Sequence, residues 1–67
     1  MTTHARSLLE KMVTALENGH ENEFDEFELD ARPVVVQELI NIGCVGRKNN
    51  ILQSIYVLRH GYDQIRP

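Results

Sequence analysis

The spacing of apolar residues changes once along this chain, at Gly43, and this change constrains the fold more than any other feature. Before Gly43 the apolar residues recur at helical spacing, and after it they follow the alternation of a strand. Two main helices followed by an extended segment predict an α+β fold. Because the chain has 67 residues and 42% hydrophobic side chains, we expect one core and a single domain over residues 1–67.

The first helix is expected in the segment TTHARSLLEKMVTALENG, residues 2–19. Thr2 or Thr3 is a suitable N-cap, and Gly19 is a suitable left-handed stop. A single apolar stripe at helical spacing runs along the segment and is predicted to face the core. The stripe consists of Leu8, Leu9, Met12, Val13 and Leu16.

The acidic segment HENEFDEFELD contains three apolar residues, Phe24, Phe27 and Leu29. The spacing of Phe24 and Phe27 suits one helical turn, whereas that of Phe27 and Leu29 suits a strand. We expect a single helical turn followed by a short extended stretch. Both aromatic rings are predicted to be buried and to anchor the acidic segment to the core.

The second main helix is expected in LDARPVVVQELINIG. Asp30 is the predicted N-cap, Pro33 lies in the first turn, where its missing N–H costs nothing, and Gly43 ends the helix. Three consecutive valines lower the helix propensity, so tertiary packing must stabilise this helix. Its predicted buried stripe consists of Val35, Val36, Leu39, Ile40 and Ile42.

A β-hairpin is expected after Gly43, with Cys44–Arg47 paired to Ile51–Leu58 across a turn that contains asparagine. Cys44 is expected to pack as a small hydrophobic residue. The last residues, RHGYDQIRP, are expected to form a short turn that returns Tyr62 and Ile65 to the core. One face of the second strand carries Leu52, Tyr56 and Leu58, and the other carries Ile51, Gln53, Ile55 and Val57.

The formal charge of −3 is unevenly divided along the chain. Residues 1–30 carry two basic and eight acidic side chains, and residues 31–67 carry five basic and two acidic ones. Such a division can create two faces of opposite potential, or it can simply keep a small protein in solution. The acidic excess counts against strong generic affinity for DNA.

Catalysis and metal binding have little support in the sequence. His4, His20 and His60 are scattered, and Cys44 has no Cys or His partner at metal-site spacing. We therefore expect no enzymatic activity, no cofactor and no metal. A single cysteine favours a reducing compartment, and we see neither a membrane span nor a signal-peptide pattern, so the expected location is the cytoplasm.

Two phrases near the end of the chain carry a family resemblance. LINIGCV, from Leu39 to Val45, is similar to the Leu-x-x-x-Gly phrase that ends many recognition helices, and YVLRHG, from Tyr56, is similar to the Tyr-x-Leu-Thr-x-x-Gly that ends the last strand. In this order, after a helix and a short helical turn, they resemble the winged helix-turn-helix family. This chain has Arg59 in place of the usual Thr, and the spacing from Leu58 to Gly61 is one residue shorter than in the family phrase.

The resemblance implies a small regulator of the phage or prophage type that binds DNA in a transcription-related role. A dimer would double the DNA-binding surface. One face of the hairpin could form the dimer interface, or the N-terminal segment could cover that face. The implied major-groove residues are Arg32, Gln37 and Asn41, and those for the phosphates or minor groove are Arg47, Lys48, Asn49 and Asn50. The possible dimer patch consists of Ile51, Ile55 and Val57.

A protein-binding role is the alternative. In that case an acidic surface would bind a basic partner, such as RNA polymerase or a nuclease. The acidic residues are Glu21, Glu23, Asp25, Glu26 and Glu28. We place DNA binding ahead because the basic and amide side chains of the second main helix and the hairpin are expected on one side.

Overall fold

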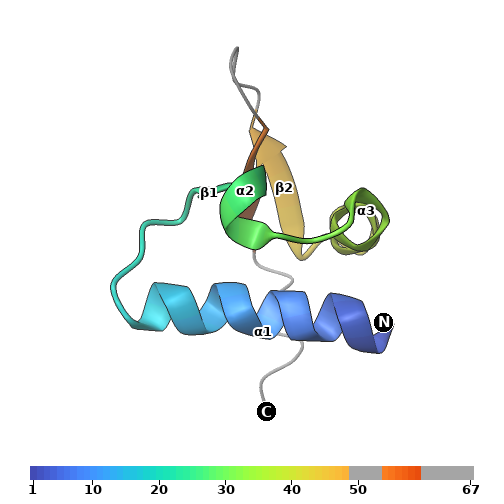
Figure 1. Cartoon of the computed structure of the whole chain (residues 1–67), viewed down its shortest axis with the longest axis horizontal. Helices are drawn as coiled ribbons and strands as arrows, with labels where there is room; N and C mark the ends of the chain where they lie inside the picture. Colours follow the sequence, from blue (N-terminus) through green and yellow to red (C-terminus); the bar gives the residue numbers. More distant parts are fainter. Residues whose placement is uncertain (49–53, 60–67) are drawn as a thin grey trace.

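A computed structural model describes residues 1–48 and 54–59. Within these residues the chain forms three helices and a small three-stranded antiparallel sheet, which confirms the α+β class. Figure 1 shows α1 along one side, the sheet standing over its middle, and α3 viewed end-on beside the sheet. The elements are α1 Thr3–Glu17, β1 Phe24–Asp25, α2 Glu26–Leu29, α3 Pro33–Asn41, β2 Val45–Lys48 and β3 Ile55–Leu58.

Helix α1 begins and ends as its sequence predicts. The Thr2 side chain accepts a hydrogen bond from the Ala5 N–H at 3.2 Å, so Thr2 is the N-cap. Gly19 follows the helix with a φ of 96°, the left-handed conformation that glycine adopts at low cost. The predicted apolar stripe faces the core, with Leu16 at its partly buried end.

The acidic segment forms its elements in the opposite order to the prediction, with β1 first and α2 second. Phe24 is 3% exposed and lies opposite Tyr56 in the sheet. Phe27 is 76% exposed, so the prediction that both rings are buried is wrong. In a helix, residues two positions apart in the sequence, such as 27 and 29, are separated by about 200° around the axis. Because Leu29 of α2 points into the core, Phe27 points outward.

Helix α3 begins two residues after the position implied by the predicted N-cap. Pro33 lies at the start of the helix, and the residue before a proline prefers an extended backbone. Arg32 takes that conformation and is the N-cap, without a side-chain hydrogen bond. Asp30 instead ends α2 with a φ of 46°, so its prediction as N-cap is wrong. Ile42, predicted to be buried, is 42% exposed because α3 ends at Asn41.

The predicted hairpin is confirmed as β2 and β3, which pair from Val45 opposite Leu58 to Lys48 opposite Ile55. β3 is the central strand because β1 pairs with its other edge, which the sequence did not predict. Tyr56 and Leu58 are buried. Several residues of the sequence predictions lie outside the described residues: Asn49, Asn50, Ile51, Leu52, Gln53, His60, Tyr62 and Ile65.

The core lies between α1, α3 and the sheet. Leu9 and Leu39 bring the two main helices together and have no exposed surface. Cys44 is also fully buried, which confirms that it packs as a small hydrophobic residue, and burial raises the pKa of its thiol. No helix within residues 1–48 and 54–59 is long and apolar enough to cross a membrane.

Candidate functional site

The link between α2 and α3 is short, and the end of α2 just before it is bound to α1. Only residues 30–32 separate the two helices. From α1, Lys11 Nζ donates to the carbonyl oxygens of Glu28 at 3.5 Å and Leu29 at 3.3 Å. These carbonyls lie at the C-terminal end of α2, where a cation is favourable. The link therefore leads from α2, bound to α1, directly into α3.

The outward side of α3 carries a stripe that we call the α3 face: Val34, Gln37 and Asn41. These positions follow the i, i+3, i+7 spacing of a single helix face. Val34 is 71% exposed, and both amides are exposed. Gln37 Nε2 donates to Asn41 Oδ1 at 2.9 Å. The two amides were candidates from the sequence, whereas Val34 was not, although its position outside the buried stripe could have indicated it.

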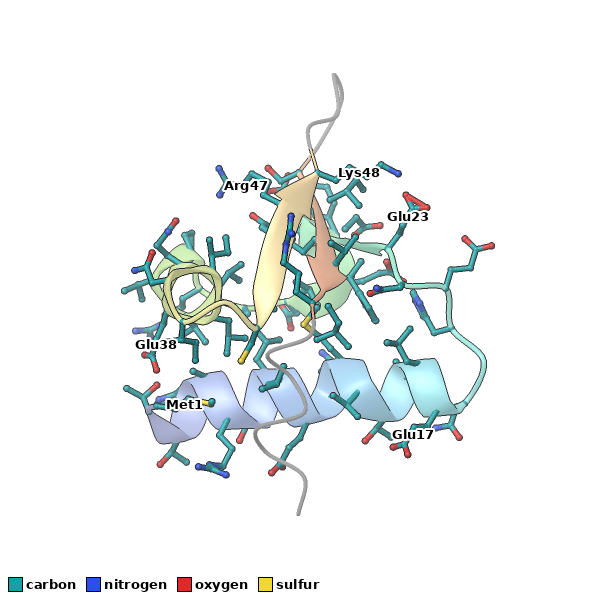
Figure 2. The ribbon with its side chains drawn as sticks, turned by 180° about the vertical axis from the view of Figure 1, so that it is seen from behind. Met1, Glu17, Glu23, Glu38, Arg47 and Lys48 are labelled. Atoms are coloured by element: carbon teal, nitrogen blue, oxygen red, sulfur yellow. The ribbon has the colours of Figure 1, made fainter. Side chains whose placement is uncertain are left out.

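Glu38 is the carboxylate of α3, and it is held away from the α3 face. Its carboxylate accepts from the backbone N–H of Thr2 at 2.8 Å and from the Thr2 hydroxyl at 3.0 Å. These two bonds and the nearby amino terminus hold the pKa of Glu38 below its usual value. Figure 2 shows Glu38 beside the labelled Met1, at the start of α1.

The two basic residues at the end of β2 point to different sides of the hairpin. The guanidinium carbon of Arg47 lies 5.6 Å from the centre of the Tyr56 ring, within the range of a cation–π contact. Lys48 Nζ lies 3.1 Å from Glu23 Oε1. In Figure 2, Arg47 lies on the side of α3 and Lys48 on the side of Glu23. Lys48 is therefore paired with the acidic segment.

Arg32 lies at the start of α3, at a shallow groove between α1 and the α2–α3 link. His4 and Lys11 of α1 line the same groove, together with Asp30 of the link. Arg32 is exposed and is the N-cap of α3. It is thus placed at the end of the α3 face that lies nearest α2, rather than within the stripe.

Part of the acidic segment is engaged in local contacts. His20 Nε2 lies 2.8 Å from Glu28 Oε1, and the His20 ring stacks on Phe24 with centroids 4.5 Å apart. Asp25 and Glu28 also form a capping box at the start of α2. The hydrogen bond to the Glu21 carbonyl, and then that to Glu28, raise the pKa of His20. The hydrogen bond from His20 lowers the pKa of Glu28.

Two further surfaces bear on partner binding. Phe27 is exposed between Glu26 and Glu28, a combination that sequence analysis missed because it assigned the ring to the core. Of the possible dimer patch, Ile55 and Val57 are half-buried.

Among residues 1–48 and 54–59, no group of three or more His, Cys, Asp or Glu side chains could hold a metal ion. A comparison of the chain with protein-family models, with curated proteins and with solved structures found no match.

Proposed function

We propose that the chain is a winged helix-turn-helix domain that binds DNA through α3 and the β2–β3 hairpin, as a small transcription-related regulator. The order of the elements supports this proposal. A helix-turn-helix joins two helices by three or four residues, and residues 30–32 join α2 to α3. The hairpin follows α3 directly, as a wing follows a recognition helix.

The observation that carries the proposal is the exposed α3 face with its amide pair. Recognition helices enter the major groove, where glutamine and asparagine side chains contact base edges. Gln37 and Asn41 are exposed on one side of α3, and the carboxylate of Glu38 is bound to Thr2. The Glu38 carboxylate keeps its charge, because its pKa is lowered, and Thr2 holds it at the α1 side of α3 rather than beside the amide pair.

The charges of the site predict modest affinity. Arg47 lies on the side of α3, whereas Lys48 is paired with Glu23. Each phosphate contact that a cation makes strengthens binding and increases its dependence on salt. With few such contacts, one copy of the chain should bind DNA weakly and only at low salt. A dimer would offset this weakness by presenting two α3 faces.

An NMR titration with duplex DNA at low salt tests the proposal. We expect the amide signals of Gln37, Asn41 and Arg47 to move, together with the side-chain amides of the α3 face. Signals from Glu10 and Thr14, which are exposed on α1, should stay in place. If the α3 signals do not move at any DNA concentration, the domain does not bind DNA through this face.

A second candidate function is binding of a basic protein through the acidic segment, and the exposure of Phe27 favours it. An aromatic ring that is 76% exposed, with acidic neighbours on both sides, combines an apolar anchor with charges complementary to a basic surface. We use RNA polymerase as the probe partner. Phe27→Ser and Glu26→Lys should abolish its capture, and Glu10→Lys is the matched charge control on α1. Equal capture by all variants contradicts this function.

A further inference from the structure

We propose that the α3 face selects A·T base pairs in the major groove. This inference rests on the proposed DNA binding and specifies the base pairs that the site accepts. It follows from which side chains α3 presents, which it lacks, and how the amide pair is bonded.

From Pro33 to Asn41, helix α3 has no side chain placed to read guanine or cytosine. The exposed Arg32, its N-cap, lies outside the stripe, at the groove beside α1. Guanine is read by arginine or lysine through its O6 and N7 acceptors, and residues 33–41 contain neither. Cytosine is read by a carboxylate that accepts from its N4 amino group. The carboxylate of this helix, on Glu38, accepts its hydrogen bonds from Thr2. Arg47 belongs to the hairpin, where it contacts Tyr56.

The hydrogen bond between the two amides leaves a pattern that matches adenine. Gln37 Nε2 donates one hydrogen to Asn41 Oδ1 at 2.9 Å, which leaves Gln37 Oε1 able to accept, and leaves Asn41 Nδ2 and the second Nε2 hydrogen able to donate. Adenine presents one donor, its N6 amino group, and one acceptor, N7. Guanine presents two acceptors at this edge, so an accepting oxygen on the protein would face another acceptor.

Val34 extends the preference to thymine. Its side chain is 71% exposed and lies one turn before Gln37, at the end of the stripe that borders the groove beside α1. An apolar side chain in the major groove contacts the thymine methyl group, which the other bases lack. At a rise of about 1.5 Å per residue, the stripe from Val34 to Asn41 is roughly 10 Å long. It therefore spans about three base-pair steps of roughly 3.4 Å each.

Binding to matched duplexes tests the inference. Fluorescence anisotropy at low salt compares duplexes of equal length and equal ends whose central base pairs are all A·T or all G·C. We expect the A·T duplex to bind at least about fivefold more tightly, the lower limit for one good amide contact. Replacing the central adenines by 7-deazaadenine removes N7, and replacing the thymines by uracil removes the methyl group. Each change should lower affinity for the A·T duplex.

Variants assign the preference to the α3 face. Gln37→Ala with Asn41→Ala should weaken the preference for A·T and remove the response to 7-deazaadenine, while Thr14→Ala on α1 should leave both unchanged. Gln37→Arg should move the preference towards G·C, because arginine reads guanine. Val34→Ala should remove the response to uracil and retain the response to 7-deazaadenine.

The outcomes of these binding experiments distinguish failure of the base preference from failure of the proposed DNA binding. Equal affinity for the two duplexes, or tighter binding of G·C, overturns the base preference and leaves DNA binding in place. A response to 7-deazaadenine that survives loss of both amides also overturns the assignment to the α3 face. Absence of binding to every duplex overturns the proposed function together with the inference.

Discussion

Glu38 of α3 accepts two hydrogen bonds from Thr2, one from the backbone N–H at 2.8 Å and one from the hydroxyl at 3.0 Å. The same hydroxyl oxygen accepts from the Ala5 N–H and so caps α1. Thr2 therefore joins the start of α1 to the middle of α3, and it holds the carboxylate away from the α3 face.

Replacing Glu38 by alanine should lower the melting temperature at neutral pH. The folded-state pKa of Glu38 is lowered chiefly by the Thr2 N–H, so its stabilising effect exists above the unfolded value of 4.5 and is lost as the pH falls through the folded value. Circular dichroism melts should show a difference between wild type and Glu38→Ala that shrinks in acid. Glu10→Ala, at an exposed position of α1, is the control. A difference that is independent of pH contradicts the role of the carboxylate charge.

Asn22 extends the sheet by one pair through its side chain. The β1–β3 register places Phe24 opposite Tyr56, so Asn22 lies opposite Leu58. Asn22 Nδ2 donates to the Leu58 carbonyl at 3.0 Å, and its Oδ1 accepts from the Leu58 N–H at 2.7 Å.

Asn22→Ala should therefore lower the free energy of unfolding by about 1–3 kcal/mol, the sum of two net hydrogen bonds. Urea denaturation measures this loss, with Asn18→Ala as the same substitution at the end of α1, outside the sheet. Asn22→Asp should also destabilise, since its carboxylate would face the Leu58 carbonyl. Equal midpoints for Asn22→Ala and wild type would show that these bonds contribute nothing.

Replacement by alanine should destabilise the protein strongly at Phe24 and hardly at all at Phe27. Phe24→Ala removes a ring that is 3% exposed, and it should cost about 3–5 kcal/mol of unfolding free energy. Phe27→Ala changes a ring that is 76% exposed and should alter stability by no more than about 0.5 kcal/mol. Thermal or urea denaturation of both variants provides the measurement. A large loss for Phe27→Ala would mean that its ring is buried after all.

The pair of His20 and Glu28 should make stability depend on pH. The raised folded pKa of His20 means that its contribution is complete below the unfolded value of 6.5 and is lost as the pH rises through the folded value. The lowered pKa of Glu28 means that its contribution is lost only in acid, as the pH falls through its folded value below 4.5. Both contributions are therefore complete between pH 4.5 and pH 6.5, the two unfolded values.

Glu28→Gln tests this pair because glutamine retains hydrogen-bonding groups and lacks the charge. Wild type should melt at a higher temperature than Glu28→Gln in mildly acidic buffer, and this advantage should diminish above the folded pKa of His20. NMR titration of the His20 ring should show a lower pKa in the variant. An unchanged His20 pKa would show that the Glu28 charge does not act on the ring.

Glu23 should weaken DNA binding by pairing with Lys48 at 3.1 Å. Glu23→Gln releases the ammonium group for a phosphate, so affinity at low salt should rise. The slope of log affinity against log salt should steepen by up to about 0.9, the value for one added phosphate contact. Anisotropy titrations at several salt concentrations measure both effects. Glu21→Gln removes the same charge without releasing Lys48, and a slope equal to that of this control excludes the phosphate contact.

Local spacing was sufficient to predict several parts of the fold. The stripe of α1, its Thr2 cap and the glycines after both main helices depend on neighbours within a few positions, so the sequence carries their signal directly. The pairing of β2 with β3 is likewise confirmed in the described residues, since the alternation that predicts it lies within one short stretch. The exposed amides of α3 follow from the same helical spacing.

Contacts between distant residues decided the rest. Asn22 and Leu58, like Thr2 and Glu38, are 36 positions apart, and Glu23 and Lys48 are 25 apart. No periodic pattern encodes such pairs, because they depend on how finished elements pack. β1 forms only because the edge of β3 is available to it. Pairing with that edge directs Phe24 inward, and the turn that follows directs Phe27 outward.

The sequence by itself determined which segments become helices and which become a hairpin, because backbone propensity and apolar spacing act locally. Only the tertiary structure decided which side chains of those segments remain available to a partner. Thr2 holds the Glu38 carboxylate at the α1 side of α3, and Glu23 pairs with Lys48 on the side of the hairpin opposite Arg47. Both results come from side chains that meet only after the helices and the sheet have packed.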